Sequence, residues 1–287
     1  MILIITLLCA AAAAVLRGFQ LARSFNPADQ LIANGDPLTI ALMVFCVLFL
    51  AGMALHLFVS AKKKQPSRLN GSPALGTVWK AVESLAAAAF LGASGIDLIM
   101  GIRETRVSII CLGALGVLAS AAVLLTALSA NRLKPNTATG FWFTIPVYWC
   151  CLLLFVDFTG FAGNPVRNAF MYGMLASVFC TLALNAAAGM FFGKPKRGRL
   201  LFYAVSAAFF ACLTLGGSLF ARVFYNPGID AAVLSVSEML KLAFITLHAG
   251  ALAFAVQKGW LMPPETLKTE DPLPPQEEHF YEGGESV

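Results

Sequence analysis

Long apolar runs separated by short polar segments dominate the chain. The runs are nearly continuous and lack the alternation of apolar and polar residues that marks a strand. A helix rises about 1.5 Å per residue, so about 20 apolar residues cross the roughly 30 Å hydrocarbon core of a bilayer. The runs of sufficient length are residues 38–61, 75–101, 107–129, 141–161, 168–192, 200–224 and 231–257. Because only helices and closed barrels satisfy every backbone group in lipid, these runs predict an all-α fold, a polytopic membrane helix bundle.

The first apolar run is shorter than the others. It covers residues 1–16, and it extends toward Phe25 only if the Arg17 side chain snorkels to the membrane surface. With this run the bundle has about eight transmembrane helices, built from four hairpins with short loops, and without it the bundle has seven. A cleaved signal peptide begins with a basic stretch that this run lacks, so we expect the run to stay and to span.

Lys and Arg residues are unequally divided between the two sets of loops. One side carries ten of them, and the other side carries six. The ten are Lys62, Lys63, Lys64, Arg68, Arg132, Lys134, Lys194, Lys196, Arg197 and Arg199, and the six are Arg17, Arg23, Arg103, Arg106, Arg167 and Arg222. Because cytoplasmic loops are the richer in Lys and Arg, both termini are predicted to be cytoplasmic. We expect an integral protein of a bacterial-type plasma membrane.

The overall composition agrees with a membrane protein. Of the 287 residues, 59% are hydrophobic and 12% are charged, whereas a soluble domain is about half apolar and about a quarter charged. The lipid bilayer is therefore the expected partner of the bundle. The basic residues lie in short loops between apolar runs, so we expect no binding of nucleic acid.

The chain divides into a transmembrane bundle, residues 1–257, and a tail, residues 258–287. The tail has seven acidic and two basic residues, five prolines and little apolar surface. Such a segment cannot bury enough apolar surface to fold. We expect a disordered, acidic, Pro-rich cytoplasmic tail that contacts a membrane or cytoplasmic partner protein, if any part of the chain does.

Motifs for catalysis or cofactor binding are absent from the sequence. There is no H-E-x-x-H, no G-x-S-x-G and no P-loop. The seven cysteines lie inside apolar runs, without C-x-x-C spacing, and predict neither a disulfide framework nor a metal site. Two histidines, His56 and His248, differ by about 6 Å in expected depth, which does not suit a haem held by both. We expect no catalytic residue, cofactor or metal, and an enzyme is the least favoured class.

Polar side chains gather on one face of the third and eighth runs. A charged side chain at the centre of a bilayer costs about 2.5–3.5 kcal/mol, so it usually faces the protein interior and has a partner. At about 100° per residue, the members on each run fall on one side of the helix. They are Lys80, Glu83, Ser94 and Asp97 in the third run, and Ser235, Glu238, Lys241 and His248 in the eighth.

The depths of these side chains match between the two runs, which are antiparallel. Glu83 lies 8 residues from the inner boundary at 75, and His248 lies 9 residues from the inner boundary at 257. Asp97 and Lys241 differ by about 9 Å in depth, which an extended Lys side chain covers. We expect the two helices to pack together, with Glu83 near His248 and with Lys241 near Asp97 or Glu238. These five residues form the candidate intramembrane polar site.

A purely structural explanation of the same residues stays open. Lys80 and Glu83 are three residues apart on one helix, as are Glu238 and Lys241, and such pairs neutralise each other near a membrane surface. In that case the polar stripe would only hold the bundle together.

Three functions fit the sequence. The first is a non-enzymatic membrane component, such as a sensor, an assembly factor or a subunit of a complex. The second is a transporter or channel for a small solute or ion, which would use the polar stripe. A quinone- or haem-linked redox anchor ranks third. A cavity that reaches Lys241 favours transport, whereas a stripe closed by ion pairs favours the first function.

The orientation yields a direct test with reporter fusions. We expect a fluorescent protein fused after Lys64 or after Arg197 to fluoresce, because both turns are predicted to be cytoplasmic. Alkaline phosphatase is expected to be active when it is fused after Thr105. Opposite locations for the Lys64 and Arg197 fusions would contradict the predicted topology.

Overall fold

The computed structural model describes most of the predicted bundle. The described residues are 2–26, 31–32, 35–62, 73–128, 137–161, 171–192, 197–224 and 234–258. Except for Lys258, the predicted tail lies outside these residues, as do most of the basic residues in the predicted cytoplasmic loops.

The described residues form eight helices, each long and apolar enough to cross a membrane. The helices are α1 (Ile2–Ser24), α2 (Pro37–Lys62), α3 (Pro73–Glu104), α4 (Val107–Leu128), α5 (Thr137–Phe161), α6 (Met171–Phe191), α7 (Arg197–Phe224) and α8 (Val236–Lys258). Between α1 and α2, two short antiparallel strands, β1 (Phe25–Asn26) and β2 (Leu31–Ile32), pair with each other. The protein is a polytopic membrane helix bundle, as the hydrophobic pattern predicts.

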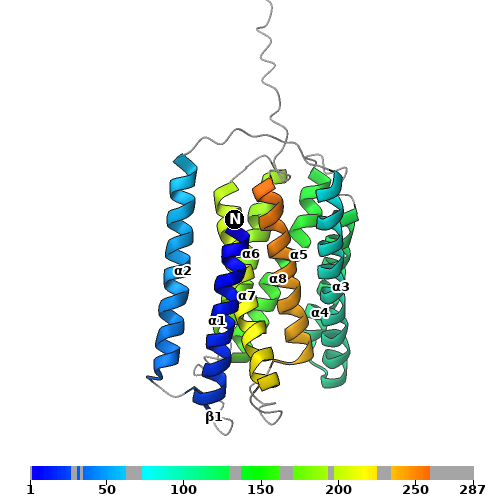
Figure 1. Ribbon diagram of the computed structural model, residues 1–287. Coiled ribbons are helices and arrows are strands. Elements are labelled where there is room, and N and C mark those ends of the chain that lie inside the picture. Colours follow the sequence, from blue (N-terminus) through cyan, green and yellow to red (C-terminus); the bar gives the residue numbers. More distant parts are fainter. Residues whose placement is uncertain are drawn as a thin grey trace, which may run out of the picture.

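Consecutive helices run in opposite directions along the bundle (Figure 1). The start of α1 and the end of α8 therefore lie at the same end, which we call the N-terminal end. The opposite end, where α1 ends and α8 begins, is called the far end. The assignment of the N-terminal end to the cytoplasm remains a prediction.

Six of the helices form a closed ring. In this ring α3 packs against α4, α4 against α5, α5 against α6, α6 against α7, α7 against α8, and α8 against α3. Helix α1 packs on the outside of α7, and α2 lies at the edge of the molecule beside α1 (Figure 1). The helix pair that carries the predicted polar stripe, α3 and α8, is thus in direct contact.

Burial differs sharply between central and peripheral helices. In α7, 72% of the residues in the apolar span are buried within the protein, but only 17% are buried in α2. Large apolar side chains of α2 face outward, for example Val47, Leu48 and Leu55. In water such a surface would be costly, but a lipid-facing helix exposes apolar side chains without that cost.

Arg17 lies inside the first span but does not snorkel. Its side chain is 2% exposed, and its guanidinium lies 5.2 Å from the centre of the Tyr172 ring on α6. Arg17 donates a hydrogen bond to Gln20, and Gln20 donates one to Thr39 on α2. Helix α1 thus extends to Ser24 without the snorkelling that we had set as the condition, because polar partners and an aromatic face inside the bundle hold this charge.

An aromatic cluster fills the middle of the six-helix ring. The Phe90 ring of α3 stacks on Phe244 of α8 with ring centres 4.1 Å apart, and it meets Trp149 of α5 at 4.3 Å. These three side chains, called here the aromatic layer, are at most 1% exposed. Large aromatic rings contribute much of the buried apolar surface of a core, and here they pack α3, α5 and α8 together.

Candidate functional site

The start of α8 is fixed by a reciprocal cap. The Ser235 backbone N–H donates to Glu238 Oε2 at 2.7 Å, and the Glu238 backbone N–H donates to Ser235 Oγ at 3.2 Å. This is a capping box, which satisfies two backbone donors that have no partner within the helix. Glu238 was one of the two alternatives for the partner of Lys241, and its carboxylate serves this cap instead.

Lys241 instead pairs with Asp97 across the α3–α8 interface. The Lys241 Nζ lies 2.7 Å from Asp97 Oδ2, and the Ser237 hydroxyl donates to Asp97 Oδ1 at 2.5 Å. Both charged side chains are largely buried, with 13% and 10% of their side-chain surface exposed. Side chains lean toward the start of their own helix, so Lys241 reaches back by about one turn to the level of Ser237.

Glu83 and His248 form a second pair, nearer the N-terminal end. His248 Nδ1 lies 2.6 Å from Glu83 Oε2, and the two side chains are 2% and 1% exposed. With a carboxylate at Glu83, the Nδ1–H group of His248 donates this hydrogen bond. The His248 ring also stacks on Phe244. The purely structural explanation placed Glu83 near the membrane surface and paired it with Lys80. The structure instead buries Glu83 and pairs it with His248.

The aromatic layer lies between the two pairs. Along α3, Asp97 follows Glu83 by 14 residues, or about 21 Å at the rise of a helix. Phe90 is the midpoint of this interval and contacts both other rings of the layer. The two charged pairs are thus separate sites and not one continuous network.

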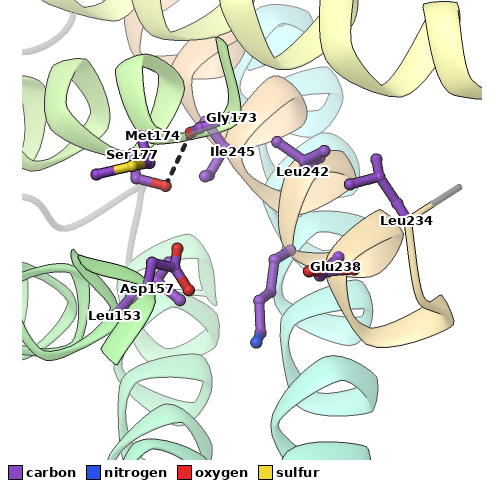
Figure 2. Close-up of a pocket in the computed structure, with 10 residues that line it drawn as sticks. Leu153, Asp157, Gly173, Met174, Ser177, Leu234, Glu238, Leu242 and Ile245 are labelled. Atoms are coloured by element: carbon purple, nitrogen blue, oxygen red, sulfur yellow. Dashed lines mark hydrogen bonds between the residues drawn. The ribbon is translucent and has the colours of Figure 1, made fainter. Parts of the chain in front are cut away.

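A partly enclosed cavity adjoins the pair at the far end (Figure 2). Its volume is about 80 Å³, several times the roughly 10–15 Å³ that a single water molecule needs. The walls come from α5, α6, α8 and Leu234, which lies two residues before α8. They consist of Leu153, Asp157, Gly173, Met174, Ser177, Leu234, Glu238, Lys241, Leu242 and Ile245.

Asp157 is the one charged wall residue that we did not predict. It lies on α5, four residues before the end of the helix, and Figure 2 shows it across the cavity from Glu238. It makes no hydrogen bond or ion pair with any residue that the structure describes. A lone carboxylate within an apolar run was a sufficient signal, because an ionisable residue there marks a functional site by default.

The charges around the cavity do not cancel. Among the described residues that line the cavity or pair with a wall residue, three carboxylates, those of Asp97, Asp157 and Glu238, accompany one ammonium group, that of Lys241. Lys241 is already engaged by Asp97, so the cavity itself presents two further carboxylates. In a medium of low dielectric constant such an arrangement attracts a cation or a proton.

Two buried donors meet beside Gly116 of α4, and one of them belongs to Trp149 of the aromatic layer. The Ser94 hydroxyl and the Trp149 indole nitrogen have no hydrogen-bond partner among the described residues, and each side chain is 1% exposed. Both approach Gly116 of α4, where an added Cβ would lie 2.2 Å from Ser94 Oγ and 2.9 Å from Trp149 Nε1. Only glycine leaves this space open.

A haem held by His56 and His248 does not fit. His56 is exposed on α2, which packs on α1 and α7, whereas His248 is buried against α3. Within the residues that the structure describes, no group of three or more His, Cys, Asp and Glu side chains has the spacing of a metal site.

Comparisons with known protein families, with curated proteins and with solved structures found no match to this chain. A role must therefore be argued from the geometry of the two pairs and the cavity.

Removal of either member of the Glu83–His248 pair tests their coupling. We expect His248→Leu to lower the free energy of unfolding by about 3–5 kcal/mol, because it leaves the Glu83 carboxylate buried and unpaired. The double variant Glu83→Leu/His248→Leu should recover much of this loss, since no charge is then left without a partner. Thermal unfolding of the purified protein in detergent measures both.

The matched control for this pair is the exposed ion pair of Glu104 and Arg106, whose charged atoms lie 3.1 Å apart. An exposed pair contributes about 0–1 kcal/mol, so Glu104→Gln should leave thermal unfolding almost unchanged. Strictly additive effects of Glu83→Leu and His248→Leu would show that the two side chains do not interact.

Proposed function

We propose that the protein transports a small solute or ion across the membrane through the polar stripe between α3 and α8. The observation that carries this proposal is the cavity that reaches Lys241, because a purely structural stripe has no need of a cavity beside its charges. Ionisable residues inside a membrane usually line a substrate or ion pathway.

The separation of the two pairs supports a transport cycle. The cavity lies within about two helical turns of the far end, since Lys241 is the sixth residue of α8 and Asp157 the fifth from the end of α5. We propose that the aromatic layer and the Glu83–His248 pair, whose side chains are at most 2% exposed, close the path toward the N-terminal end. A transporter exposes its site to one side at a time, and this arrangement is that of a site facing the far end.

Lys241 is the side chain that can change its ion-pair partner. Its ammonium is carried on a flexible stem of four carbons, and Asp97, Asp157 and Glu238 all lie in its electrostatic surroundings. We propose that exchange of Lys241 between these carboxylates accompanies binding and release of the solute.

A non-enzymatic membrane component is the second candidate. The observation that favours it is the Glu83–His248 pair, which is almost fully buried and holds α3 against α8 in the manner of a structural contact. In this case the tail would bind a partner protein.

Neither candidate assigns a catalytic residue, and we propose that the protein is not an enzyme. We also propose that it resides in a bacterial-type plasma membrane with both termini in the cytoplasm.

Flux through reconstituted vesicles tests the transport proposal. The full chain is reconstituted into vesicles. For charged probes, the concentration of Na⁺, K⁺, ethylammonium, protons, chloride or acetate is raised suddenly and the current is recorded on a solid-supported membrane. For the neutral probes glycerol and propanol, light scattering follows the change in vesicle volume. We expect protein-dependent flux of at least one of these probes. The double variant Asp97→Asn/Lys241→Met removes both charges together, which limits the loss of stability, and it should abolish the flux.

Glu104→Gln is the control, because this exposed carboxyl lies outside the polar stripe and should leave the flux unchanged. Absence of flux for every probe would contradict transport and favour the second candidate. Equal flux for the wild type and for the double variant would show that the pathway does not use the stripe.

A further inference from the structure

We infer that the cavity binds a small organic ammonium ion, a protonated amine with a short aliphatic body, with Asp157 as its main ligand. This inference rests on the proposed function and names the class of solute. It follows from three properties of the walls: the free carboxylates, the number of acceptors and the apolar remainder.

The free carboxylates set the sign of the charge. Asp97 already receives the Lys241 ammonium and the Ser237 hydroxyl. Glu238 uses Oε2 in the α8 cap, and Asp157 has no partner among the described residues. An anion in the cavity would lie against two carboxylates and would be repelled, whereas a cation is attracted.

The number of acceptors fits an ammonium group. A primary ammonium has three N–H donors, and three acceptors line the cavity from three helices: Asp157 on α5, Ser177 on α6 and Glu238 on α8 (Figure 2). The Ser177 hydroxyl is 4% exposed and donates its own proton to the Gly173 carbonyl at 3.2 Å. Its oxygen is therefore left to accept a hydrogen bond from a ligand.

Lys241 shows the same recognition with a tethered ligand. Its ammonium lies 2.7 Å from Asp97, on the wall next to the cavity. An ammonium group is therefore already bound by a carboxylate of this cluster, and a free amine would repeat that contact on Asp157.

The remaining walls separate an amine from a metal ion. They are aliphatic or thioether side chains, namely Leu153, Met174, Leu234, Leu242 and Ile245. Mg²⁺ and Ca²⁺ take six or more oxygen ligands, waters included, at about 2.0–2.6 Å, and among the described residues no three His, Cys, Asp or Glu side chains are placed to hold a metal ion. An aliphatic body of a few carbon atoms, in contrast, buries its surface against these walls.

Calorimetric titration of the full chain in detergent tests the class of ligand. The probes are ethylammonium chloride, 1-propanol as its neutral counterpart, sodium acetate as an anion, and the chlorides of Na⁺ and K⁺ at equal ionic strength. We expect saturable binding of ethylammonium only. Asp157→Asn should weaken it by about tenfold or more, because the amide oxygen still accepts a hydrogen bond but lacks the negative charge that strengthens it. Ser177→Ala should weaken it less, and the exposed-site control Glu104→Gln should bind as the wild type does.

The outcomes separate this inference from the proposed function. Saturable binding of acetate or propanol, no binding of ethylammonium, or equal ethylammonium affinity in the wild type and Asp157→Asn would overturn the ligand class, even if vesicle flux of another solute is found. Should Asp157→Asn fail to fold, the selectivity of the wild type among the probes still decides. Binding of ethylammonium without any vesicle flux would leave the site standing and reject transport.

Discussion

The structure depends on the contact between α3 and α8, where charged side chains that lipid would not tolerate neutralise one another. Lys241 and Asp97 form an ion pair there, and His248 and Glu83 share a buried hydrogen bond. Each member would be costly alone, since a buried charge without a partner loses its solvation and gains nothing. The pairs therefore fix both the register and the facing sides of the two helices, and they close the six-helix ring.

The two pairs differ in how closely the surrounding side chains pack against them, so the two ends of the bundle interior differ. Around Glu83 and His248 the packing is tight, and Phe244 covers the histidine ring. Around Lys241 the packing leaves a cavity with two additional carboxylates. One pair thus has the surroundings of a structural contact, and the other has those of a binding site. The aromatic layer lies between them along α3.

Hydrophobic runs and depth matching predict the helices and the partners of His248 and Lys241, because the length of a span and the rise of a helix are simple geometric quantities. Arg17 and Glu238 were predicted less well. Arg17 bonds to Gln20 and does not reach the membrane surface, and Glu238 accepts a hydrogen bond from the Ser235 backbone and does not pair with Lys241. Both partners are polar groups three residues away in the chain. Asp157 was missed although its carboxylate stands alone in an apolar run, which was signal enough; what the run could not show is that α5, α6 and α8 form a cavity around it. Whether these residues form a functional site remains a prediction.

The most direct measurement is cross-linking of α3 to α8 in membranes, after the seven native cysteines have been replaced. An added Cβ at Gly92 would lie 3.4 Å from Leu240 Cδ1, so Gly92→Cys combined with Leu240→Cys should react with a short bifunctional thiol reagent. The neighbouring Leu91 is 50% exposed and faces away, and Leu91→Cys with Leu240→Cys should react poorly. Efficient reaction of the first pair alone supports the contact between α3 and α8, and equal or absent reaction of both would contradict it.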